Sequence, residues 1–130
     1  IGILAGSMLL VFGSTTDKAK ATKVVSNLRS LKAAALMYYA DEGEFPASGD
    51  ILALENYLDR PIASDDVVEE YGIGTCSGDT SIYAEVKSVG DVQKYLQDMA
   101  TESGLYNGDG TEFTAGTGNT AKEVHVRLGN

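Results

Sequence analysis

The single histidine, His125, is the first residue to consider for chemistry, because acid–base and nucleophilic catalysis most often use an imidazole. It lies between Glu123 and Arg127 in a segment whose apolar and polar residues alternate. That alternation predicts a strand over 123–128 with His125 on its polar, solvent-exposed face. No serine or cysteine stands in a recognisable catalytic motif with this histidine, so the sequence argues against an enzyme.

The acidic, glycine-rich segment 107–112 is the strongest candidate for binding a metal ion. Asn107, Asp109 and Glu112 bring oxygen-bearing side chains close together in the sequence, and Ca²⁺ prefers about six to eight oxygen ligands. An Asp-Gly pair is also a common sequence for a tight β-turn. We favour the turn, and a calcium site made of these three side chains is the alternative.

Two further features carry little chemistry. Cys76 is the only cysteine, so it cannot form a disulfide within the chain or a Cys-x-x-Cys metal motif. We expect it to be buried as a small apolar residue. The segment 116–122 is glycine-rich and ends in a lysine, but it lacks the spacing of a phosphate-binding loop. Apart from the candidate calcium ion, the sequence predicts no cofactor.

Charge is distributed unevenly along the chain, which has 130 residues and a formal net charge of −9. Residues 17–40 carry five basic side chains against one acidic side chain, whereas residues 41–130 are strongly acidic. Nucleic-acid binding requires clustered lysine and arginine, so no nucleic-acid partner is predicted. The basic segment can face solvent, anionic lipid or a neighbouring acidic domain.

The first element is an apolar tip. Residues 1–16 carry no charged side chain, and the tip residues that we expect to enter a membrane or a helix bundle are Ile1, Gly2, Ile3, Leu4, Met8, Leu9, Leu10, Val11 and Phe12. Because a spanning helix needs about 20 apolar residues, we expect this chain to start partway through a longer apolar helix. Gly13 is the predicted flexible point of that helix.

An amphipathic stem continues the tip over residues 17–40. Its apolar side chains recur every three or four residues, the period of a helix with one buried stripe; they are Val24, Val25, Leu28, Leu31, Ala35 and Tyr38. Gly43 can end this helix, and Pro46 prevents its continuation. The sequence therefore predicts one N-terminal helix over 1–40, with its tip at 1–16 and its stem at 17–40.

Residues 41–130 predict a small acidic globular head. Residues 41–80 are expected to form a connector with a short helix over 50–59 and a loop-like end, because of Gly72, Gly74 and Gly78.

A strand is predicted over 81–87, followed by a helix that starts with the capping signature Ser88–Asp91 and ends at Gly104. Its predicted buried stripe is Val89, Val92, Leu96, Met99 and Ala100. Two short strands are expected within 105–115. The predicted fold class is α+β, with a long N-terminal α-helix packed on a small antiparallel sheet.

Residues 1–46 resemble the N-terminal helix and first turn of the type IV pilins and the related pseudopilins. The resemblance lies in Ile1-Gly-Ile-Leu-Ala5, Val24-Val-Ser-Asn-Leu-Arg-Ser-Leu31 and Met37-Tyr-Tyr-Ala-Asp-Glu-Gly-Glu-Phe-Pro46. The glutamate, the helix-bending proline and the C-terminal cysteine pair found in many members of that family have no counterpart in this sequence.

The resemblance implies a structural filament subunit, a major pilin that assembles through its N-terminal helix and displays its acidic head. It implies copies of itself as the main partner, in a homopolymer. The inner or cytoplasmic membrane before assembly and the pilus or secretion assembly machinery are further implied partners. The implied location is the cell envelope and then an extracellular filament. A pseudopilin of a type II secretion system and a membrane-anchored binding module remain open as alternatives.

Overall fold

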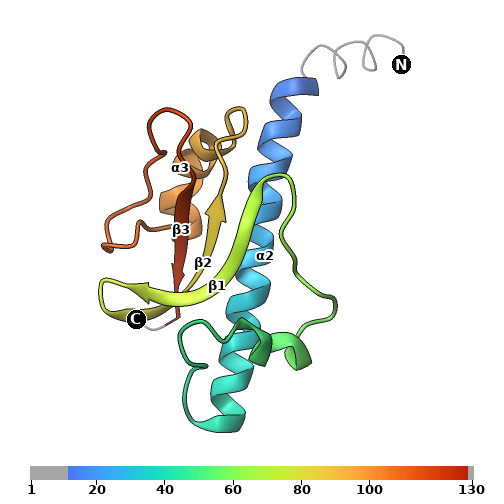
Figure 1. Ribbon diagram of the computed structural model, residues 1–130, viewed down its shortest axis with the longest axis vertical. Helices are drawn as coiled ribbons and strands as arrows, with labels where there is room; N and C mark the ends of the chain where they lie inside the picture. The colour runs from blue at the N-terminus through green and yellow to red at the C-terminus, as the bar shows by residue number, and fades with distance from the viewer. Residues whose placement is uncertain (1–11, 129–130) are drawn as a thin grey trace.

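The computed structural model describes residues 12–128 and shows a long helix standing beside a small sheet (Figure 1). In chain order the elements are α2 (Phe12–Glu42), the 3-10 helix η1 (Ile51–Tyr57), β1 (Val68–Cys76), β2 (Asp79–Val86), α3 (Val92–Ser103) and β3 (Lys122–Arg127). The predicted α+β architecture is confirmed. Of the predicted tip, residues 1–11 lie outside the described residues, and Phe12 and Gly13 begin α2.

The stem packs on the head through the stripe that the sequence predicts. The buried apolar residues of α2 are all at most 6% exposed: Ala21, Val24, Val25, Leu28, Leu31, Ala34 and Ala35. Helix α2 contacts α3, η1, β2 and β3. The helix ends as expected, because the N–H of Gly43 donates to the carbonyl of Tyr39 at 2.8 Å and Gly43 adopts φ = 78°.

The three strands form an antiparallel sheet in the order β1-β2-β3. A two-residue turn at Ser77 and Gly78, both with positive φ, joins β1 to β2. The register places Ile73 opposite Ile82 and Ile82 opposite Val126. These three side chains are at most 6% exposed, so one face of the sheet forms the core with α2.

β1 corrects the expectation that the connector ends in a loop. Gly72 and Gly74 are strand residues, and Gly72 pairs with Tyr83 of β2. A Cβ atom on Gly72 would lie 2.7 Å from the ring of Tyr83, and one on Gly74 would lie 3.3 Å from it. The missing side chains of these glycines therefore make room for the ring of Tyr83 on the neighbouring strand. From the sequence alone, glycines of this kind cannot be told from the glycines of a turn.

The region around α3 also differs in part from the expectation. The helix begins at Val92, so Val89 precedes it, and the Ser88 hydroxyl donates to the carbonyl of Gly118 instead of capping the helix. The stripe of α3 is otherwise as predicted, and Gly104 ends the helix with φ = 67°. The two strands expected in 105–115 reduce to isolated bridges that pair Tyr106 with Glu112 and with His125.

Candidate functional site

His125 is buried, which corrects its predicted position on an exposed strand face: only 2% of the residue is accessible. The segment after α3 covers this part of β3, because Tyr106 and His125 exchange two backbone hydrogen bonds of 2.9 Å. The ring of Tyr83 lies 5.5 Å from the imidazole, centroid to centroid. Strand alternation identifies two faces of a strand, but it does not show whether a distant segment covers the polar one.

The buried imidazole joins a serine and a carboxylate. His125 Nδ1 lies 2.8 Å from Ser81 Oγ, and His125 Nε2 lies 3.0 Å from Glu123 Oε1. A serine, a histidine and an acid in contact are the residue types of a hydrolytic triad. Ser81, however, is 0% exposed, so no substrate can reach its hydroxyl in this conformation. We interpret this set, the Ser81–His125–Glu123 network, as satisfied polar groups of the head.

The candidate calcium segment folds as the turn that its Asp-Gly pair predicts. The N–H of Gly110 donates to the carbonyl of Asn107 at 3.0 Å. Asp109 Oδ1 accepts hydrogen bonds from the hydroxyl and the N–H of Thr111 at 2.6 and 2.9 Å, which lower the pKa of this carboxyl. The side-chain amide of Asn107 donates to Thr111 Oγ1 at 2.9 Å and to the backbone carbonyl of Glu112 at 3.1 Å. The carboxylate of Glu112 instead accepts a hydrogen bond from the hydroxyl of Thr101.

Within residues 12–128 no three histidine, cysteine or acidic side chains are grouped as a metal site would require. Calcium binding by Asn107, Asp109 and Glu112 stays a prediction. Cys76 is buried, as predicted, and its thiol donates to the carbonyl of Asn107 at 3.3 Å. Burial raises the pKa of this thiol, so the reactive thiolate is disfavoured.

One exposed surface of residues 12–128 is the side of α2 that points away from the sheet. Besides Lys18, Lys23 and Arg29, α2 exposes small residues that recur mostly every three or four positions: Ala19, Thr22, Ser26, Ser30, Ala33 and Ala40. We call this set the outward face. Small side chains allow a second helix to approach closely. The sequence signal for it is the same helical period as the buried stripe, on the opposite side of the helix.

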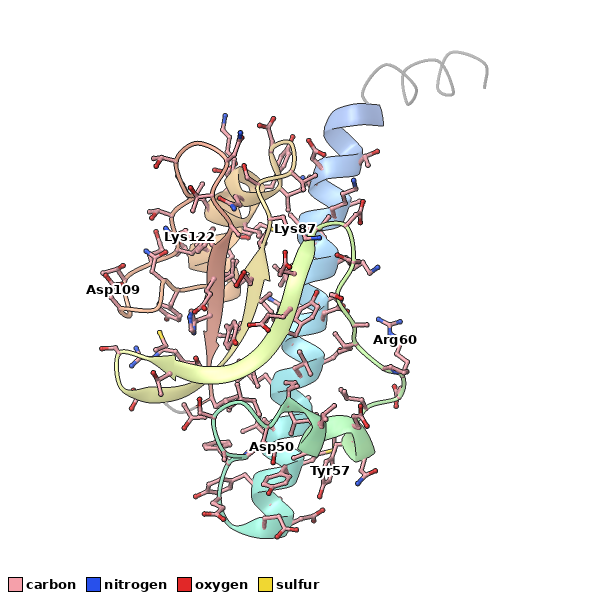
Figure 2. All side chains as sticks on the ribbon, viewed as in Figure 1. Asp50, Tyr57, Arg60, Lys87, Asp109 and Lys122 are labelled. Atoms are coloured by element: carbon pink, nitrogen blue, oxygen red, sulfur yellow. The ribbon has the colours of Figure 1, made fainter. Side chains whose placement is uncertain are left out.

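Toward its end α2 also exposes apolar side chains. Leu36, Met37 and Tyr39 are 46–47% exposed, and Leu52 of η1 is 69% exposed. Beside them α2 and the segment after η1 enclose a groove of about 320 Å³, lined by Ser30, Ala33, Met37, Tyr57, Leu58, Asp59, Arg60 and Ile62. Figure 2 shows Tyr57 beside the lower part of α2 and Arg60 on the segment that leads away from η1.

Polar contacts hold the walls of this groove. The Tyr57 hydroxyl donates to Asp41 Oδ2 at 2.7 Å, and this hydrogen bond raises the pKa of Tyr57 to about 12. Farther along the segment, Asp65 Oδ1 accepts the N–H groups of Val67 and Val68 at 2.8 Å each. Burial opposes ionisation of Asp65, but these two bonds and Lys23 hold its pKa below the ordinary value.

Comparison with solved structures identifies this arrangement. The chain superimposes on the structure of the major type IV pilin PilA1 from Clostridium difficile with a TM-score of 0.67 and 23% sequence identity, over 90% of this chain and 99% of that chain. The chain has the type IV pilin fold. No protein-family model and no curated protein matches the sequence.

The pilin fold gives the two faces of α2 different surroundings. One face lies in the core of the head, and the outward face is left open beside the groove. Within the described part of the chain, no helix has both the length and the apolar character needed to cross a bilayer. The tip residues expected to enter a membrane or a bundle, Ile1 to Val11, lie outside residues 12–128, and bending at Gly13 stays a prediction.

Proposed function

We propose that this chain is a structural filament subunit that polymerises with copies of itself through its N-terminal helix and displays its acidic head outward. The observation that carries the proposal is the outward face of α2, exposed and built of small residues from Ala19 to Ala40. The pilin fold supports it, because one solved structure with the same fold is that of a major type IV pilin.

Burial provides the driving force for assembly. Each buried CH₂ contributes about 0.8 kcal/mol, and α2 leaves Leu36, Met37 and Tyr39 about half exposed. Helix packing between copies would cover these side chains and the small residues before them. Because the outward face of one copy meets a different surface of the next, the contact need not close on itself and can extend into a filament.

The apolar tip, residues 1–16, carries no charged side chain. Its side chains favour either a bilayer or a bundle of similar helices, and both environments bury apolar area. A subunit of this kind would lie in the membrane before assembly, would be moved by an assembly machinery, and would end in an extracellular filament.

Immunogold electron microscopy of native cells, with an antibody to residues 41–130, tests the proposal. Label along long surface fibres is the expected result. Label confined to the envelope, with short fibres only on overexpression, would favour a secretion pseudopilin. A complete absence of fibres in both conditions would contradict the proposal and favour a membrane-anchored binding module.

A matched pair of variants ties the result to the outward face. Ala33→Arg places a long charged side chain on that face, and Ala121→Arg makes the same change at an exposed position before β3. We expect Ala33→Arg to reduce surface fibres at least about tenfold, with Ala121→Arg at the wild-type level. Circular dichroism should show both variants folded. Equal fibre yields from the two variants would contradict assembly through this face.

A further inference from the structure

Charge is segregated along α2 and the segment that follows it. Residues 17–32 hold five basic side chains and one acidic one, whereas residues 33–64 hold six acidic side chains and one basic one. The six acidic residues are all exposed and are here called the acidic end: Asp41, Glu42, Glu44, Asp50, Glu55 and Asp59. The stem lysines are Lys18, Lys20 and Lys23. Figure 1 shows the early turns of α2 and its last turn with η1 at opposite ends of the molecule.

The two clusters cannot neutralise each other within one chain. Lys20 and Asp41 belong to the same uninterrupted helix, 21 residues apart. At about 1.5 Å per residue this separation is about 30 Å, whereas an ion pair needs contact within about 4 Å. Among residues 33–64 Arg60 is the one basic side chain against six acidic ones, so a second molecule is the natural source of the counter-charge that the acidic end lacks.

The stem lysines have weak partners in their own chain. Lys20 lies 3.6 Å from Asp66 and Lys23 lies 3.7 Å from Asp65. Lys18 makes no ion pair with any residue in the described range 12–128. Ion pairs that are open to solvent add little to stability, so these lysines can turn to a neighbouring carboxylate at little cost.

The acidic end borders an apolar surface of the kind that forms the centre of an interface. Asp59 lines the groove, and Asp41 bonds to Tyr57, which also lines it. Leu36 and Met37 lie exposed on the same part of α2. An apolar centre with a charged rim is the usual anatomy of a protein–protein contact, and the rim selects the partner and its orientation.

We propose that the acidic end and its groove dock a second copy of this chain, displaced along the helix axis so that the basic turns of its stem lie level with the acidic end. The two surfaces are different, so each copy offers one of them to the copy above and the other to the copy below. Such a contact repeats without closing. The inference rests on the proposed filament function and adds to it the axial register between neighbours.

Carbodiimide cross-linking of the unaltered chain in native cells tests this contact directly, because the reagent joins ammonium and carboxylate groups only where they touch. Links of Lys20 to Asp66 and of Lys23 to Asp65 serve as internal controls within one chain. We expect additional links, found by mass spectrometry, between the stem lysines and the acidic end. Recovery of the internal links alone would overturn the inference.

Charge reversal provides a second test. Glu42→Lys, Glu55→Lys and Asp59→Lys together should lower sheared surface filaments at least about tenfold. Adding Lys18→Glu, Lys20→Glu and Lys23→Glu to the same chain should bring the amount of filaments most of the way back to the wild-type level. The matched control, Asp98→Lys with Glu102→Lys on exposed positions of α3, should leave filaments at the wild-type level.

The outcomes separate this inference from the proposed function. Wild-type filaments without the expected cross-links, or without rescue by the combined reversal, overturn the docking inference and leave the filament function standing. If the expected cross-links form but the unaltered chain makes no filaments, the docking contact is supported and the filament function is contradicted. The absence of both contradicts both. The cross-linking arm uses the unaltered chain, so it does not depend on the folding of a variant.

Discussion

The Ser81–His125–Glu123 network and the outward face of α2 differ in both chemical character and exposure to solvent. The network has the residue types and distances of a catalytic site, at 2.8 and 3.0 Å, but its serine is 0% exposed. The outward face has almost no reactive groups, yet it is open along the helix. Accessibility, rather than the chemical character of the side chains, decides which region can meet a partner.

The same contrast appears in the two faces of α2. Leu28 and Leu31 are at most 1% exposed, while Ser30 and Ala33, one or two positions away, are exposed. The difference is a rotation around a single helix. It teaches that one element can serve folding on one side and association on the other, and that substitutions on the two sides should have separable effects.

The largest effect is expected from truncation of the buried face. Leu28→Ala should lower the free energy of unfolding by about 3 kcal/mol, because the side chain is fully buried and its loss leaves a cavity. Ala33→Ser on the outward face should change it by less than about 0.5 kcal/mol. Urea unfolding of the full chain in detergent measures both. Similar values for the two variants would remove the distinction between the faces.

The second effect concerns the network. His125→Ala should lower the free energy of unfolding by about 2 kcal/mol, since it leaves the hydroxyl of Ser81 without its 2.8 Å partner in a buried position. Ser81→Ala should lower it by about 1 kcal/mol. Filament yield per folded subunit should stay unchanged in Ser81→Ala. If a folded Ser81→Ala chain lost a cellular function, the network would have a functional role, and the contrast with the outward face would be wrong.

A smaller, pH-dependent effect is expected from Asp65, which holds the segment beside the groove. Its folded pKa is below 3.8, so its stabilising contribution is complete above that unfolded value and is lost as pH falls through the folded pKa. Between about pH 5 and about pH 3 the melting temperature of the wild type should therefore fall more than that of Asp65→Asn. Parallel decreases in the two proteins would show that Asp65 contributes nothing specific.

The smallest effect is spectroscopic and compares one tyrosine from each region. Tyr57 lines the open groove and Tyr83 contacts His125, and both have a pKa raised to about 12. Asp41→Asn should return Tyr57 toward 10.0, because the hydrogen bond to Asp41 is the main cause of its shift.

Glu70→Gln should lower the pKa of Tyr83 only in part, because burial is the larger cause there. Tyrosinate absorbance followed through a pH titration of the full chain measures both changes. A complete return of Tyr83 in Glu70→Gln would show that its ring is more accessible than the structure places it. Raised tyrosine pKa values contribute stability below pH 10.0 that is lost as pH rises toward about 12.

Much of the fold follows from local patterns. The stem helix, its buried stripe and its end at Gly43 follow from a 3.6-residue period and a glycine with positive φ. The strands β2 and β3 follow from alternation, and the buried state of Cys76 follows from residue type. These features depend on neighbours within a few positions, which a sequence displays directly.

What the sequence alone determined is therefore the helix, its two-sided character, the acidic head and the separation of basic from acidic segments. Only the tertiary structure decided that Gly72 and Gly74 lie in a strand under Tyr83, that Tyr106 covers His125, and that the segment after η1 forms a groove beside α2. Each of these depends on residues distant in the chain. Periodicity shows which face of an element is apolar, but the contacts between distant segments determine which face remains open.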